Sequence, residues 1–126
     1  MIVIHYTAMP DTDAACRTLC NPQTEVSAHY LIDEDGTVRS LVSEDMRAWH
    51  AGAGQWGAVT DVNSRSIGIE IVNPGHDLEY PAFPDAQIAS VIDLSRDIVA
   101  RHHIKPVRVL AHSDVAPLRK ADPGEK

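Results

Sequence analysis

Three chemically different side chains fall close together near the end of the chain: His112, Lys120 and Asp122. The segment before them, Val107 to Ala111, alternates with a period of two, which predicts a strand that ends where the chain enters a loop at His112. Asp122 stands directly before Pro-Gly, a turn pair that fixes the backbone around its carboxylate. Zinc accepts both imidazole nitrogen and carboxylate oxygen, and a catalytic zinc site keeps one position open. The segment therefore indicates a metal centre; the alternative is a loop of solvated charges in which His112 only closes the strand.

A third ligand must come from elsewhere, because catalytic zinc usually has three protein ligands and a water. The chain opens with an apolar run, residues 2–4, that is followed at once by His5. Side chains at the ends of neighbouring strands converge at one edge of a sheet. We therefore expect His5 to lie beside His112.

A carboxylate interrupts the apolar segment 66–72, which lies between the two histidines. Its alternation places Gly68, Glu70 and Val72 on one face of a predicted strand. A carboxylate in so apolar a strand costs free energy unless it has a partner. Because Val72 shares its face and Gly68 leaves room beside it, we expect Glu70 to belong to the site. The alternative is a residue on the solvent face of a half-exposed strand.

The elements that must position these residues follow from local patterns. We expect a strand at residues 2–6, a helix at 13–20, a hairpin of residues 28–33 and 37–42 around Asp35-Gly36, and a long helix at 85–102. The long helix carries an apolar stripe formed by Ile88, Val91, Ile92, Ser95, Ile98 and Val99. The order β-α-β-β-β-α-β predicts an α/β domain, a mixed β-sheet flanked by helices with the metal site in a groove at the strand ends.

Four further residues are candidates for substrate binding. His29 alternates with its neighbours in the hairpin, so it points either toward the metal cavity or into the core. Trp49 and His50 stand in a segment rich in glycine and alanine, where we expect Trp49 to anchor the core and His50 to reach the cleft. The alternative for that segment is a surface loop pinned by Trp49. Asn73 begins the turn that ends the Glu70 strand and completes the set.

Five segments carry a family resemblance: VIHYT, SAHYLI, AWHAG, SIGIEIVN and HSDVAPLRKADPG, in that order. Together they resemble the zinc-dependent N-acetylmuramoyl-L-alanine amidases of type 2, which share their fold with peptidoglycan recognition proteins and amidase-type phage lysozymes. The resemblance extends from His5 to Gly124. One departure is Leu118, where many members of the family carry glycine; we expect it to alter loop packing more than chemistry.

The resemblance implies an enzyme with one Zn2+ per chain, held by His5, His112 and Asp122. Glu70 matches the carboxylate that assists the attacking water, and Lys120 matches the cation beside the scissile carbonyl. The implied reaction is hydrolysis of the amide between N-acetylmuramic acid and L-alanine, in peptidoglycan or a muropeptide fragment. The alternative is a non-catalytic module of the same fold that binds muropeptide; such relatives lack a zinc ligand, whereas all three positions are filled here.

Composition limits the other possibilities. The 126 residues suffice for one domain, residues 1–126, and the resemblance implies relatives that continue past this C-terminus, so a truncated end is one expectation. A net charge of −7 without a basic cluster argues against nucleic acid as a partner. No stretch approaches the roughly 20 apolar residues of a membrane span, and no signal peptide is evident. We expect a cytoplasmic monomer, or a protein of the cell envelope or periplasm if a leader has been lost.

Overall fold

Five short strands form one mixed sheet in the order β3-β2-β4-β1-β5. The central strands β1 (Ile2–Tyr6) and β4 (Ile67–Ile71) are parallel, with β5 (Val109–Ala111) beside β1 and β2 (Tyr30–Ile32) beside β4, both also parallel. The outer strand β3 (Val38–Ser40) pairs antiparallel with β2, as the Asp-Gly turn predicts. This computed structural model describes residues 1–124, and the predicted domain end at 126 lies outside them. The predicted α/β class is confirmed, and so is the predicted order of helices and strands as far as β5.

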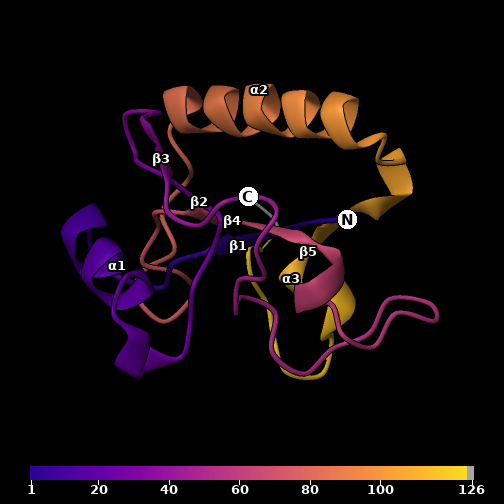
Figure 1. Ribbon diagram of the computed structural model, residues 1–126. Helices are drawn as coiled ribbons and strands as arrows, with labels where there is room; N and C mark the ends of the chain where they lie inside the picture. Colours follow the sequence, from indigo (N-terminus) through magenta and orange to yellow (C-terminus); the bar gives the residue numbers. More distant parts are fainter. Residues whose placement is uncertain (125–126) are drawn as a thin grey trace.

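Helices cover both faces of the sheet (Figure 1). The long helix α2 (Asp85–His102) lies across one face, whereas α1 (Thr12–Leu19) and the short α3 (His112–Val115) lie on the opposite side. Short 3-10 turns at Pro22–Thr24, Asn63–Arg65 and Pro106–Arg108 connect the elements. Within residues 1–124, no helix combines the length and the apolar character needed to cross a membrane.

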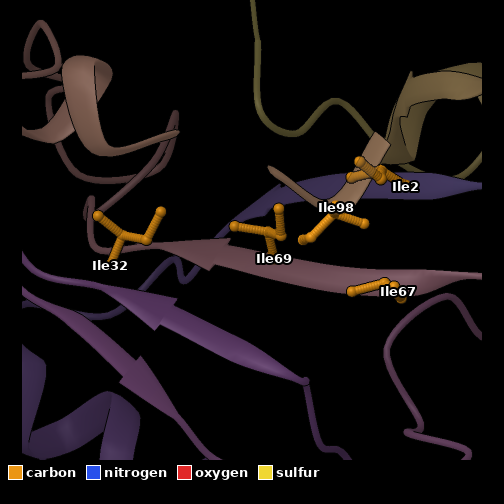
Figure 2. Close-up of a cluster of buried hydrophobic side chains, with 5 residues drawn as sticks. All are labelled: Ile2, Ile32, Ile67, Ile69 and Ile98. Atoms are coloured by element: carbon orange, nitrogen blue, oxygen red, sulfur yellow. The ribbon is translucent and has the colours of Figure 1, made fainter. Parts of the chain in front are cut away.

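Side chains alternate between the two faces of the central strands, so one face forms the core and the other carries the candidate site residues. Between α2 and the sheet, five isoleucines from both form a buried cluster that Figure 2 shows: Ile2, Ile32, Ile67, Ile69 and Ile98. Each contributes about 1.5–3 kcal/mol by leaving water. Strand register pairs Val3 with Gly68 and His5 with Glu70, so these side chains share the face away from α2. That face therefore carries the polar residues of the central strands.

The predicted apolar stripe of α2 is partly wrong. Ile92 is 46% exposed, while Ile98 is buried and Val91, Leu94 and Val99 pack against the isoleucine cluster. The inward face also includes Gln87, which is fully buried because its amide donates to the carbonyls of Ile32 and Val72. A polar residue on the core face concealed the true register of the stripe.

The last strand begins later than the sequence predicts, and it is followed by a helix. Val107 belongs to the 3-10 turn Pro106–Arg108 and is 68% exposed. Pro106 has a fixed φ and no N–H, which favours starting such a turn over joining the sheet. His112 is the first residue of α3, whereas the sequence analysis places it at the start of a loop.

Candidate metal centre and active site

Two histidines and one aspartate converge at the carboxyl ends of β1 and β5. His5 is the second-last residue of β1, and His112 follows β5 directly. Because β1 and β5 are neighbours in the sheet, the two rings lie close together. Asp122 arrives on the loop after α3, where its carbonyl accepts a hydrogen bond from the Ser113 N–H. His5 Nδ1 is 2.9 Å from His112 Nδ1, and Asp122 Oδ2 is 3.2 Å from each of them. All three side chains are buried.

The donor set suits a small divalent cation. His112 Nε2 lies 2.8 Å from the Ala51 carbonyl, which only accepts, so the proton of the neutral ring is on Nε2 and a lone pair on Nδ1 faces the cluster. The separations of 2.9 and 3.2 Å between ligand atoms are near the tetrahedron edge of roughly 3.3 Å that Zn–N and Zn–O distances of about 2.0–2.1 Å imply. Nitrogen and oxygen ligands that converge in this way can hold a metal ion.

Electrostatics around the cluster favour a neutral His5 and an ionised aspartate. Burial lowers the pKa of His5, although the neighbouring Asp122 carboxylate opposes that change. Burial alone would raise the pKa of Asp122, but the close approach of His112 and His5 outweighs it and holds the pKa below its usual range. Both conditions suit metal binding, because ligands must be deprotonated to coordinate.

Glu70 lies next to His5, its register partner on the neighbouring strand. Its Oε2 is buried and has no hydrogen-bond partner among the described residues. Burial, reinforced by the charge of Asp122 and opposed by Lys120, raises the pKa of Glu70 to about 8. A buried carboxyl group with so high a pKa is typical of functional sites. The exposed Lys120 lines the same cleft, whose volume is about 230 Å³.

Trp49 does not anchor the core as the sequence analysis predicts: it is 48% exposed and forms part of the cleft wall. His50 lines the same cleft, in agreement with the sequence analysis, but it is only 8% exposed. The His50 ring lies directly on Gly68, where a Cβ atom would stand 2.4 Å from His50 Cγ. Because Gly68 has no side chain, there is space for the His50 ring in the interior.

His29 and Asn73 do not reach the cleft. His29 is fully buried: its Nδ1 accepts from the Gly68 N–H, and its Nε2 donates to the Met46 carbonyl. Of the two positions left open for His29, the structure shows the core. Asn73 is also buried, and its side chain holds the following turn by bonding the Gly75 N–H and the Pro81 carbonyl. The expected substrate contacts are thus not available to these two residues.

An aromatic group beside Asp122 had no counterpart in the sequence analysis. The Tyr80 hydroxyl donates to the Pro123 carbonyl at 2.9 Å, next to Asp122. The His76 ring stacks on Tyr80 at 4.2 Å and hydrogen-bonds the Tyr6 hydroxyl. The loop between β4 and α2 therefore holds the loop that carries Asp122. Its several aromatic residues among Pro and Gly were the only local signal.

A buried His-His-Asp cluster beside an unpaired carboxyl group, at the carboxyl ends of parallel strands, is the arrangement of a mononuclear metallohydrolase. Comparison with known proteins narrows this class. The sequence profile of the N-acetylmuramoyl-L-alanine amidases, Amidase_2, matches residues 1–125, and the chain belongs to this family.

Individual relatives agree with this assignment. N-acetylmuramoyl-L-alanine amidase AmiD of Escherichia coli (strain K12) is 45% identical, over 98% of this chain and 48% of the relative. The 1,6-anhydro-N-acetylmuramyl-L-alanine amidase AmpD of the same organism is 37% identical over 79% of this chain and 52% of its own length. The chain thus spans about half the length of the curated relatives it matches.

Solved structures share the fold. E. coli AmiD in complex with the substrate anhydro-N-acetylmuramic acid-L-Ala-D-γ-Glu-L-Lys superimposes with a TM-score of 0.90 at 43% identity, covering 98% of this chain and 52% of that one. AmpDh3 from Pseudomonas aeruginosa, in complex with an anhydromuramic pentapeptide, gives a TM-score of 0.91 at 36% identity, covering 98% and 54%.

Proposed function

We propose that this chain is a zinc-dependent N-acetylmuramoyl-L-alanine amidase, which hydrolyses the amide between N-acetylmuramic acid and L-alanine in peptidoglycan or its muropeptide fragments. The observation that carries the proposal is the convergence of His5, His112 and Asp122 next to the partly buried Glu70 in one cleft. The substrate follows from the relatives, since AmiD and AmpDh3 bind anhydromuramyl peptides.

His5, His112 and Asp122 would hold one zinc ion. Bound zinc supplies Lewis acidity, which polarises a carbonyl and makes water acidic near neutral pH. Glu70 accepts the proton of the attacking water and returns it to the departing amine. Burial raises the pKa of Glu70 above that of an exposed carboxyl group, and a group whose pKa lies closer to the working pH accepts and releases a proton more readily.

The remaining cleft residues orient and stabilise the substrate. The Lys120 ammonium stabilises the negative charge that develops on the amide oxygen. Trp49 offers a flat apolar surface to the sugar or the peptide. His50 also lines the cleft but is only 8% exposed, so its main contribution is made through His5, which it contacts.

The test combines metal content with turnover of a purified anhydromuramyl tripeptide. We expect one zinc per chain, release of free amine, and loss of activity on chelation. Glu70→Gln should keep its zinc and lose activity, while the exposed Glu34→Gln should resemble the wild type. A wild-type protein that holds zinc and binds the muropeptide without cleaving it would instead support the non-catalytic binding module.

A further inference from the structure

The nitrogen of His5 that points away from the metal cluster contacts a second histidine. His5 Nε2 lies 3.0 Å from His50 Nδ1, and both side chains are buried. When two neutral imidazoles meet nitrogen to nitrogen, one must donate and the other must accept. The direction of this bond decides which nitrogen of His5 keeps its lone pair for a metal.

The far end of the hydrogen-bond chain fixes that direction. Ser66 Oγ lies 2.6 Å from the Val62 carbonyl, which can only accept, so the hydroxyl proton points to Val62. The Ser66 oxygen is then left to accept from His50 Nε2, 3.1 Å away. With its proton on Nε2, neutral His50 has a bare Nδ1 that accepts from His5 Nε2. The lone pair of His5 is consequently on Nδ1, which faces His112 and Asp122.

Packing holds His50 in the required orientation. Its ring lies flat against Gly68, and the ring of His29 meets it edge-on at 5.9 Å. The backbone N–H groups of His50 and Ala51 both donate to Asn63 Oδ1, so the main chain is fixed as well.

We propose that His50 and Ser66 are positioning residues for the metal centre: they hold His5 in the tautomer and ring orientation that present Nδ1 to the ion. The two histidine ligands then differ in support, because His112 is oriented by a backbone carbonyl and His5 by a relay of two side chains. A relay of side chains can be altered by single substitutions. The inference depends on the metal site of the proposed function, but not on the reaction.

The experiment measures zinc affinity by competition with a chromogenic chelator, together with the visible absorption spectrum of the Co2+-substituted protein. His50→Leu removes the acceptor and should weaken zinc binding roughly tenfold to a hundredfold, the usual effect of losing a residue that orients a ligand. It should also change the Co2+ spectrum. His50→Gln keeps an acceptor oxygen and should restore most of the affinity.

Two serine variants provide the matched pair. Ser66→Ala removes the end of the relay and should weaken zinc binding several-fold, whereas Ser64→Ala changes an exposed serine two positions away and should leave affinity and spectrum unchanged. The serine variants alter little packing, so they keep the test valid even if His50→Leu does not fold.

The outcomes separate this inference from the proposed function. Unchanged zinc affinity and Co2+ spectrum in Ser66→Ala and in folded His50→Leu would overturn the relay, as would equal losses in His50→Leu and His50→Gln, which would indicate packing alone. If the zinc affinities of the wild type and the variants follow the expected order but the wild type cleaves no amide, the relay is supported and the amidase is refuted. A wild type without zinc affinity would overturn both.

Discussion

Replacing Glu70 by glutamine should stabilise the metal-free protein at alkaline pH, although it removes the proposed catalytic group. Burial raises the pKa of Glu70 from 4.5 to about 8, so the folded protein holds a proton that the unfolded chain releases. Stability from this group is fully present below the unfolded pKa and is lost as pH rises through the folded one. The free energy of unfolding of the wild type should therefore decrease as pH rises from 4.5 to about 8, and that of Glu70→Gln should not show this decrease.

The magnitude follows from the same pKa. At about 1.4 kcal/mol per pH unit, the full displacement corresponds to an upper limit of roughly 5 kcal/mol. Between about pH 5 and about pH 8, the expected loss in the wild type is about 3 kcal/mol. Glutamine keeps the size of the side chain and cannot ionise, so packing changes little. Other titrating groups act equally in both proteins and cancel in the difference.

Urea denaturation of the chelator-treated proteins, followed by circular dichroism across this pH range, gives the free energy of unfolding for each. The exposed Glu34→Gln should run parallel to the wild type. Zinc should reduce the gap between wild type and Glu70→Gln, because a nearby cation favours the ionised carboxylate. Parallel curves for metal-free wild type and Glu70→Gln would refute the reasoning, since Glu70 would then not be desolvated.

Three further perturbations test the surroundings of the site. Tyr80→Phe removes the hydrogen bond to Pro123, worth about 1 kcal/mol, and should weaken zinc binding several-fold in a chelator competition; unchanged affinity would show that the Asp122 loop holds itself. Trp49→Ala should raise KM for the muropeptide about tenfold without lowering Tm, because the ring is half exposed; a lower Tm at constant KM would make it a structural residue. Glu44→Gln breaks the ion pair with Arg101 and should cost about 1–2 kcal/mol at neutral pH after allowance for solvent screening. Because the Arg101 guanidinium lowers the pKa of Glu44 to about 2, this contribution is present above the ordinary 4.5 and disappears as pH falls toward the lowered value, as urea denaturation at neutral and acidic pH would show; equal losses at both would contradict the ion pair.

The contrast between Ile69 and Ile92 shows how far local patterns reach. The alternation of segment 66–72 puts Ile69 on the face opposite Glu70, and the structure places Ile69 in the buried isoleucine cluster, because side chains alternate strictly along a strand. Ile92 was assigned to a buried face and is exposed, because a helix has a continuous range of faces and the buried Gln87 concealed the true one. Pattern reasoning is therefore strongest where the geometry allows only two answers.

The sequence by itself determined the strands, the hairpin, the two main helices and the strand ends at which His5 and His112 stand, because these depend on periodicity and turn residues within a few positions. Only the tertiary structure decided the roles of the other histidines and of Trp49. His50 is almost fully buried because Gly68, on β4, leaves space for its ring, whereas Trp49 is 48% exposed. His29 is in the core because a distant carbonyl and amide satisfy both its nitrogens. Such choices depend on what an element brought from elsewhere in the chain places against a side chain, and no pattern of neighbours along the sequence contains that information.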